Sequence, residues 1–419
     1  MSFVQVLSLL LLLCCLLIAV WRRINIGVLG LSATFVIALL SHTPAAEVYK
    51  SFPGKIFSLI VGVSLLFAHL ERSGAIRTLT NAVFRLIGPH RWLVPWAAFC
   101  IAVALSTAGA FSTATISLLV PVVGALSIRD PRNFFVSEMG VVIGANLAGL
   151  SPLNPTGATV REALNRTHTD YPVWGLWLIA VLFAVAAVLS LQLFQKALLR
   201  AGRGPIIMGK SAEEAGEQEV TAANHVYSLV SWLGLAAFIL GVVVFGTDVG
   251  LTAFAIALVL QLLFRPSEKS LLSHIPWNAV LLLCGLLTYL GLIQQIGTMD
   301  VVQDWLGGVS SVVALIFIIA YTAAVLSNIE SSTLGVLTLL APILGATIGS
   351  GSHVLWAVAA MCVPAALTVM NPVHVAGTLI IANAAEEEQS RAFPRLFATA
   401  VTLSLIAPAI GAGVAALFV

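Results

Sequence analysis

The sequence predicts an all-α polytopic membrane protein made of two inverted repeats, and three observations lead to this fold class. Hydrophobic residues make up 59% and charged residues 9% of the 419 residues, and the mean hydropathy is +1.04. An ordinary soluble domain has about 45–50% apolar and about 25% charged residues. Apolar runs long enough to cross a bilayer recur along the chain, and two polar motifs each occur twice, about 220 residues apart.

Ten apolar runs are the predicted transmembrane helices, because a hydrocarbon core about 30 Å thick requires about 17–25 residues of helix. The first run lacks a preceding basic segment, so we expect a retained helix and not a secretory signal. The five cysteines fall inside apolar runs and are expected to be packing residues. The predicted spans are 3–20, 24–41, 55–71, 133–150, 172–195, 226–246, 249–264, 276–294, 355–370 and 396–417.

The distribution of positive charge predicts the orientation of these spans. With the N-terminus outside, sixteen of the 20 Lys and Arg residues are cytoplasmic, and four are external: Lys50, Lys55, Arg161 and Arg166. An excess of positive charge on the cytoplasmic side is typical of membrane proteins. The count requires residues 91–128 and 308–347 to form re-entrant hairpins. We therefore expect a multi-pass protein of the cell membrane (inner or plasma membrane) with both termini external and no nucleic-acid partner.

Two polar motifs recur in the same order and indicate an internal duplication. "ALSTAGAFSTATISLLVP" ends at Pro121 and "VLSNIESSTLGVLTLLAP" ends at Pro342, an offset of 221 (342 − 121). Asn154-Pro155 and Asn371-Pro372 follow the two motifs at an offset of 217 (371 − 154). A fixed internal period is the signature of a repeated architecture.

The repeats define the predicted domains. Residues 1–195 form the first repeat, with a hairpin at 91–128 and a broken helix at 133–164. Residues 196–225 form a polar cytoplasmic linker. Residues 226–419 form the second repeat, with a hairpin at 308–347 and a broken helix at 355–385. Each repeat has five crossings, an odd number, so the second must be inverted relative to the first. Inverted repeats with interrupted helices are typical of secondary transporters.

Proline and glycine residues predict where the two broken helices unwind, because proline removes a backbone donor and clashes with the preceding turn. Unwound backbone inside a membrane is tolerated where it is buried in protein or lines a wet cavity. Half-helix N-termini there suit an anion, and carbonyl and hydroxyl oxygens suit a small cation. The predicted break residues are Pro152, Pro155 and Gly157 in the first repeat, and Pro364, Pro372 and Gly377 in the second.

The segments "FSTATISLLVP" and "IGANLAGLSPLNPTG" resemble the ion transporter superfamily, especially the divalent anion/sodium symporters and the malonate and other dicarboxylate carriers. This resemblance covers essentially the whole chain. It implies a homodimer with a static scaffold and a mobile transport domain that moves in an elevator-like manner. The family's Ser-Asn-Thr triplet falls on Phe111, Ser112 and Thr113, so its asparagine is missing here.

The resemblance and the repeated motifs together give two sets of candidate site residues. His374 is more typical of a satisfied buried histidine than of a ligand. Glu330 has two interpretations, a helix cap at the water-exposed rim or a group that binds or relays the coupling cation. The substrate-binding set is Ser112, Thr113, Asn154, Pro155, Thr156, Ser332, Thr333, Asn371 and Pro372. The cation-binding set, where sodium is possible, is Ser106, Thr107, Asn146, Gly149, Ser327, Asn328 and Glu330.

The predicted function is secondary active transport of a small organic anion, coupled to sodium or protons, with no other cofactor. We expect a dicarboxylate such as malonate or succinate, although citrate, sulfate, arsenite or gluconate would satisfy the same argument. The alternatives are an anion channel or a membrane enzyme. The chain has no H-E-x-x-H or G-x-S-x-G motif, which argues against an enzyme.

Overall fold

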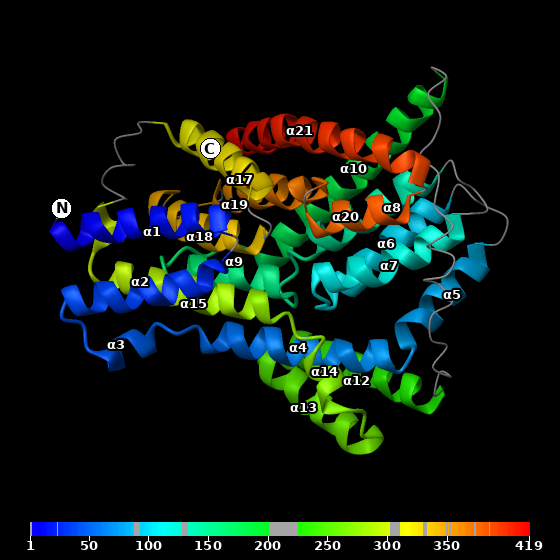
Figure 1. The fold of residues 1–419 in the computed structure, drawn as a ribbon, viewed down its shortest axis with the longest axis horizontal. Coiled ribbons are helices and arrows are strands. Elements are labelled where there is room, and N and C mark those ends of the chain that lie inside the picture. The colour runs from blue at the N-terminus through cyan, green and yellow to red at the C-terminus, as the bar shows by residue number, and fades with distance from the viewer. Residues whose placement is uncertain are drawn as a thin grey trace.

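The computed structural model is a bundle of helices, several of which lie side by side along its longest axis (Figure 1). It describes residues 2–22, 24–87, 93–127, 133–200, 225–301, 311–329, 333–348, 351, 353–372, 374–384 and 386–419, and these form no β-strand. The helices of the first part of the chain are α1 (Phe3–Arg22), α2 (Ile26–Leu40), α3 (Ala45–Lys50), α4 (Gly54–Arg72), α5 (Ala75–Ile87), α6 (Val94–Thr107), α7 (Ser112–Ser127), α8 (Phe134–Ala148), α9 (Pro155–Asn165) and α10 (Val173–Arg200). Those of the second part are α12 (His225–Val243), α13 (Val249–Phe264), α14 (Glu268–Leu272), α15 (Trp277–Gln295), α17 (Val312–Ile329), α18 (Thr333–Ile348), α19 (His353–Leu367), η3 (Thr368–Met370), α20 (Val375–Asn383) and α21 (Glu386–Ala416).

Each of the ten predicted spans coincides with a helix of the structure. Six described helices are long and apolar enough to cross a membrane: α4, α10, α12, α15, α19 and α21. Two boundaries were predicted wrongly. Helix α10 continues to Arg200, past the predicted end at 195, and α21 begins at Glu386, ten residues before the predicted start at 396. Both extensions contain good helix formers such as Glu, Gln, Ala, Leu and Arg, so the helices extend beyond their apolar runs.

Both predicted hairpins contain a pair of helices, and both predicted broken helices are interrupted. Helices α6 and α7 lie in the first hairpin and α17 and α18 in the second. The first broken helix stops at Ala148 and resumes at Pro155, and the second stops at Leu367 and resumes at Val375 after η3. Pro364 was expected to unwind its helix, but it lies inside α19, which continues to Leu367.

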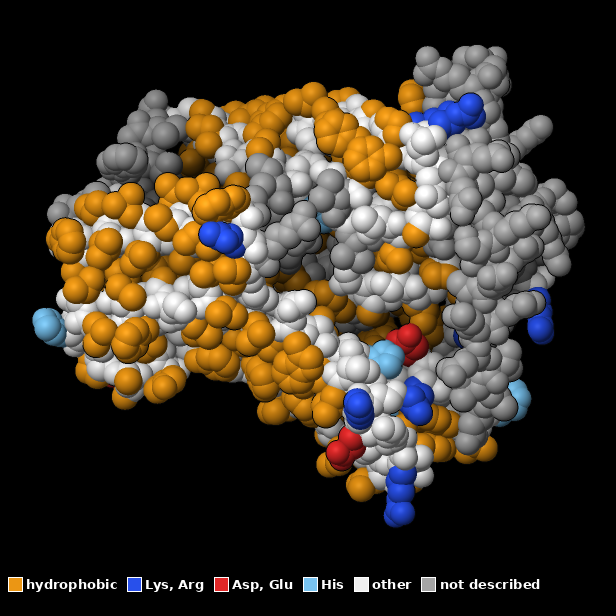
Figure 2. Space-filling view, in the orientation of Figure 1, with side chains coloured by type: hydrophobic (Ala, Val, Ile, Leu, Met, Phe, Trp, Pro, Cys, Tyr) orange, Lys and Arg blue, Asp and Glu red, His pale blue; other side chains and the backbone are white. Residues whose placement is uncertain are grey.

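Burial separates inner helices from peripheral ones. In α4, α15 and α19, 67–78% of an apolar 18-residue window is buried, whereas in α10, α12 and α21 the share is 22–28%. Large hydrophobic side chains are exposed on the peripheral helices, for example Leu193, Leu233 and Leu405 at 60–66% exposure. Figure 2 shows a face dominated by hydrophobic side chains, with most of its charged side chains towards one end. This pattern is that of a protein whose flanks face lipid.

Helices of the two parts of the chain pack against each other in a reciprocal way. Helix α2 packs against α15, and α13 packs against α4. A Cβ added to Gly27 would collide with the backbone at Leu281, and one added to Gly250 would meet the backbone at Ser58. The same offset of 223 relates Gly27 to Gly250 (250 − 27) and Ser58 to Leu281 (281 − 58). Glycines therefore allow the same close backbone approach in two equivalent places.

Candidate functional site

The tip between α6 and α7 is the first of two places where a hairpin meets a broken helix. Gly109 has φ of +117° in this tip, a conformation that glycine adopts without a steric penalty. A Cβ at this position would lie 3.0 Å from the carbonyl oxygen of Leu153 in the break between α8 and α9. The hairpin tip is thus pressed directly against the interruption of the broken helix.

Asn154 ties this tip to the start of α9. Its Nδ2 donates to the carbonyl oxygens of Ser106 at 2.9 Å and Ala110 at 2.7 Å, and its Oδ1 accepts from the Thr156 amide at 3.0 Å. The side chain is fully buried. Because its amide is already bonded on both sides to the protein, Asn154 acts in this conformation as a positioning residue and an N-cap.

Two hydroxyl groups complete the first junction. Ser151 Oγ donates to the Thr107 carbonyl at 2.8 Å, and Ser112 Oγ donates to the Ala145 carbonyl at 2.9 Å. A Cβ added to Gly149 would lie 2.7 Å from Ser112 Oγ. Glycine at 149 therefore lets the first residue of α7 approach the end of α8, where the backbone turns out of the helix.

The second junction joins the end of α17 to the break after α19. His374 Nε2 donates to the Ser327 carbonyl at 2.8 Å, and Asn371 Nδ2 lies 3.3 Å from the Asn328 carbonyl. Ser327 Oγ donates to the Ala365 carbonyl at 2.8 Å and lies 3.2 Å from Thr333 Oγ1. His374 is thus a satisfied buried histidine, as expected, and it also holds the second hairpin in place.

Two hydrogen bonds of the first junction have counterparts in the second, and these correct the predicted pairing of Asn154 with Asn371. His374 donates to the Ser327 carbonyl as Asn154 donates to the Ser106 carbonyl. Asn371 donates to the Asn328 carbonyl as Ser151 donates to the Thr107 carbonyl. The offset of these pairs is 220 (374 − 154), close to the hairpin offset. A signal for this pairing is present in the sequence, because Asn154 and His374 each precede a glycine by three residues.

The structure brings most of the predicted residues to the two junctions. Pro155 occupies the first turn of α9, where it needs no hydrogen-bond donor. Pro372 is buried in the second break, and Thr113 is half-buried on α7. Thr107 is placed differently, because its hydroxyl accepts a bond from Trp177 Nε1 at 3.0 Å and lines a hydrophobic cavity of about 460 Å³. Ser332 and Glu330 lie outside the described residues, so their roles stay predictions.

At the first junction, the side-chain N–H group of Asn146 donates no hydrogen bond. Its Nδ2 is buried and has no hydrogen-bond partner. It lies one turn before Gly149, whose carbonyl accepts from the Gly157 amide of α9 at 3.0 Å. A buried amide donor without an acceptor costs about 1–3 kcal/mol, so this N–H is available to an acceptor that the protein does not supply. Among the described residues, no group of three or more His, Cys, Asp or Glu could hold a metal ion.

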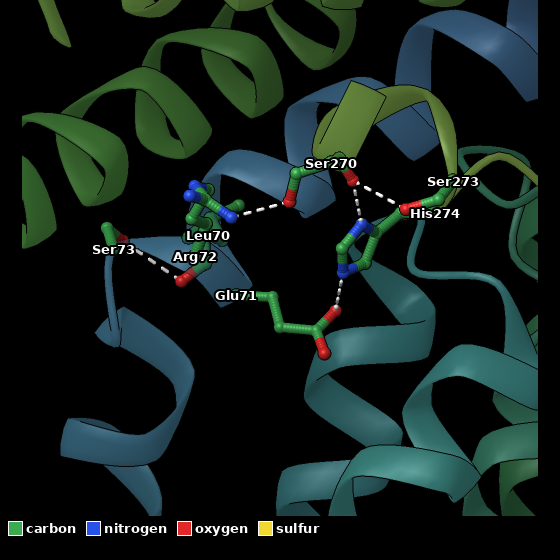
Figure 3. A network of polar contacts seen from close by, with 7 residues as sticks. All are labelled: Leu70, Glu71, Arg72, Ser73, Ser270, Ser273 and His274. Carbon is green, nitrogen blue, oxygen red and sulfur yellow. Dashed lines mark hydrogen bonds and ion pairs between the residues drawn. The ribbon is translucent and has the colours of Figure 1, made fainter. Parts of the chain in front are cut away.

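A second cavity, of about 280 Å³, opens between α4, the hairpin tip and the loop before α15. It is lined by Thr113 and Ser117 of α7 and by Glu71 and His274, and Figure 2 shows a hollow in the corresponding face. Figure 3 shows His274 between Ser270 and Glu71: Nδ1 donates to the Ser270 carbonyl at 2.6 Å, and Nε2 lies 3.6 Å from Glu71 Oε2. The contact between His274 and Glu71 is an ion pair only when His274 is protonated.

Arg166 occupies the equivalent place in the other half. Its Nη1 donates to the Leu287 carbonyl at 3.1 Å and its Nη2 to the Ser51 carbonyl at 3.4 Å, while Gln294 Nε2 donates to the Arg166 carbonyl at 2.7 Å. The helix offset of 223 (277 − 54) relates the two sets of residues. It pairs Leu287 with Ser64, Gly291 with Ala68, Gln294 with Glu71 and His274 with Ser51.

Comparisons with known proteins identify the family. A model of the citrate transporter family matches residues 16–364, while a comparison with curated protein sequences found no match. Among solved structures, the YdaH transporter of Alcanivorax borkumensis has a TM-score of 0.62 at 14% identity, covering 100% of this chain and 98% of that chain. MtrF of Neisseria gonorrhoeae, which its description assigns to a class of antimetabolite efflux pumps, has a TM-score of 0.60 at 12% identity, covering 98% and 95%.

These two structural matches extend over nearly the whole chain, so they establish the fold. The family match covers well over half of the chain and agrees with the expectation of an ion transporter from the hairpin and broken-helix motifs. It also agrees with the expectation that the protein is not an enzyme. The chain is a multi-pass membrane protein that belongs to the citrate transporter family of anion transporters.

Proposed function

We propose that the protein is a secondary active transporter that carries a small polycarboxylate, of which citrate is the first candidate. The family match supports citrate over the malonate or succinate that the sequence motifs favoured. Three carboxylates need several donors, and the first junction offers the Asn146 amide and the Thr113 hydroxyl, together with the positive end of the α9 dipole. The Ser112 hydroxyl and the Thr156 amide donate within the protein in this conformation. Helix N-termini and amide N–H groups are suited to anions that no Lys or Arg contacts directly.

The observation that carries this proposal is the buried, unpartnered Nδ2 of Asn146. The sequence analysis placed Asn146 in the cation set, but its buried group without a partner is the Nδ2 donor, and a donor suits a carboxylate. We therefore assign Asn146 to the substrate. The carbonyl and hydroxyl oxygens at Ser106, Ser327 and Asn328 remain the candidates for a coupling cation, either sodium or a proton relay.

An inverted-repeat architecture with alternating access fits this function. Its support comes from the reciprocal packing of α2 on α15 and α13 on α4, and from the matching bonds of the two junctions. In this mechanism α4 and α15 belong to a scaffold, and the hairpins with their broken helices belong to a moving domain. The elevator movement, the homodimer and the external termini are parts of the same proposal.

Counterflow of labelled citrate tests the proposed function. Purified protein in liposomes preloaded with unlabelled citrate should take up external labelled citrate in a saturable manner, and excess malonate or succinate should compete less well than citrate. Asn146→Leu should weaken citrate binding by about tenfold or more, the effect of losing one buried hydrogen bond to a charged group. Thr402→Ala, an exposed hydroxyl of α21 bonded to its own helix, is the matched control. Uptake equal to that of empty liposomes for every anion would contradict the proposal.

A further inference from the structure

Glu138 is a carboxyl group that the proposed site does not use. It lies in the second turn of α8 and is fully buried. Neither Oε1 nor Oε2 has a hydrogen-bond partner. A carboxyl group in the membrane-embedded part of a transporter is costly, and it faces the interior of the bundle when it is retained.

The residues one turn before and one turn after Glu138 on α8 are apolar. Phe134, Val141 and Val142, one turn away on the same helix, are each fully buried. The hydroxyl of the neighbouring Ser137 is directed to the Asn133 carbonyl at 2.8 Å and is not bonded to Glu138. Phe134 packs in a cluster with Ala384 and Ala392 near the start of α21. The Glu138 carboxyl group is thus buried without a hydrogen-bond partner, and an ionised carboxylate is strongly disfavoured in such a place.

Within the part of the chain that the structure describes, no charged group bonds to the Glu138 carboxyl group. Helix α8 packs against α6, α7, α10, α19, α20 and η3, and its Phe134 also packs near the start of α21. Among the side chains that the structure describes, the titratable residues of these helices are Cys100 of α6, Lys196 of α10, His353 and Cys362 of α19, and Arg391 and Arg395 of α21. Glu138 is hydrogen-bonded to none of them. Lys196 is exposed at the surface of its helix. Because an unpaired buried charge is more costly than a neutral acid, Glu138 carries its proton in this conformation.

Helix α8 connects Glu138 to the proposed substrate site. Asn146 lies eight residues further along the same helix, which corresponds to about 12 Å along its axis. A displacement of α8 that exposes the Asn146 end to the other side of the membrane would move Glu138 with it. A neutral acid that later reaches water or a positive group can release its proton.

We propose that Glu138 is a proton-binding site of the moving domain, loaded in the conformation of this structure and discharged in the alternative one. This inference rests on the proposed transport function. One proton binds to one carboxylate oxygen and later leaves to water, so no other reactant is needed. The proton would then be a coupling ion, and Glu138 would hold it about two turns of α8 away from the substrate.

Infrared spectroscopy tests the protonation state without any transport assay. At neutral pH the wild type should show the C=O stretch of a protonated carboxyl group in apolar surroundings, and Glu138→Gln should lack it. Glu47→Gln, which removes an exposed carboxyl group paired with Lys50, should retain it. If no band depends on Glu138, the group is ionised and the proposal is wrong.

Transport measurements in liposomes test the discharge step. For each coupled proton, a gradient of one pH unit changes the equilibrium accumulation ratio by about tenfold. Glu138→Gln should lose this factor while it retains citrate binding and citrate counterflow, which require no net proton movement. If the band is present but the variant responds to the pH gradient as the wild type does, Glu138 is a permanent neutral acid and the inference fails. If the wild type binds no citrate, the proposed function fails while the infrared result still stands.

Discussion

The contacts of Arg166 with Leu287 and Ser51, called the Arg166 junction below, and the cavity at Glu71 occupy equivalent places in the two halves of the chain. The two places are built differently. The Arg166 guanidinium fills its place and bonds the carbonyls of Leu287 and Ser51. The cavity keeps about 280 Å³ open beside Glu71 and His274. Residue 291 is a glycine whose added Cβ would lie 2.9 Å from Arg166 Nη1, whereas its equivalent, Ala68, lines the cavity.

This difference is what a carrier requires when it is open on one side and closed on the other. The residues Ser117 and Thr338, related by the hairpin offset of 221 (338 − 117), report it directly. Ser117 is exposed in the cavity, and Thr338 is fully buried. We infer that the Arg166 junction is the closed side and the Glu71 cavity the open side, and that transport exchanges the two conditions. In the orientation predicted from charge, the open side is cytoplasmic.

Filling the open cavity should have the largest effect. Ala114 is exposed and lines the cavity, and Ala114→Trp would place an indole where the scaffold and hairpin must approach each other. We expect counterflow to fall to the level of empty liposomes while equilibrium citrate binding is retained, because closure and not the site is blocked. Ala114→Ser, which adds little volume, should transport as the wild type does. Normal counterflow by the Trp variant would show that the cavity does not close.

Removing the Arg166 side chain should have the next largest effect. Arg166→Ala eliminates two hydrogen bonds from a charged donor, each worth about 1.5–3 kcal/mol. We expect a loss of about 3 kcal/mol in the free energy that holds the closed junction, measured as a lower unfolding temperature in detergent and slower counterflow. Arg161→Ala is the control, because Arg161 is an exposed arginine of α9, the helix that Arg166 caps. Equal unfolding temperatures for the two variants would contradict the assignment of Arg166 as a tie.

Changes at the Glu71 and His274 pair should have the smallest effect. Their side chains are 41% and 34% exposed and 3.6 Å apart, and exposed ion pairs contribute about 0–1 kcal/mol. Glu71→Gln should therefore change counterflow by no more than about fivefold. Arg166→Gln, measured in parallel, should be clearly worse. If Glu71→Gln slowed counterflow more than Arg166→Gln does, Glu71 would have a role in transport beyond its contact with His274.

The sequence predicted much of this fold because apolar runs and repeated motifs record burial and spacing directly. The hairpins at 91–128 and 308–347 enclose α6 with α7 and α17 with α18, and the ten spans coincide with helices. Helix α21 was shortened in the prediction because its first turns are polar, and hydropathy marks the lipid-embedded part of a helix and not its end. Pro364 was expected to break α19 but is accommodated inside it.

The candidate site was predicted less completely, since matching residue names is not the same as matching contacts. Asn154 and Asn371 share the Asn-Pro dipeptide, yet the bond that Asn154 makes to the hairpin is made in the other half by His374. Glu138 had no sequence signal, because one acidic residue in an apolar run does not reveal whether it has a partner. The Arg166 junction depends on Ser51 and Leu287, which are distant in sequence and contribute only backbone carbonyls.

Side-specific cysteine labelling tests the difference between the two halves most directly. In a variant whose five native cysteines are replaced by alanine, Ser117→Cys and Thr338→Cys are each exposed to a membrane-impermeant thiol reagent in vesicles of known orientation. We predict that Ser117→Cys reacts from the cytoplasmic side and Thr338→Cys is protected, and that adding Arg166→Ala makes Thr338→Cys reactive from the external side. Equal reactivity of both cysteines from both sides would contradict alternating access and indicate an open path through the protein.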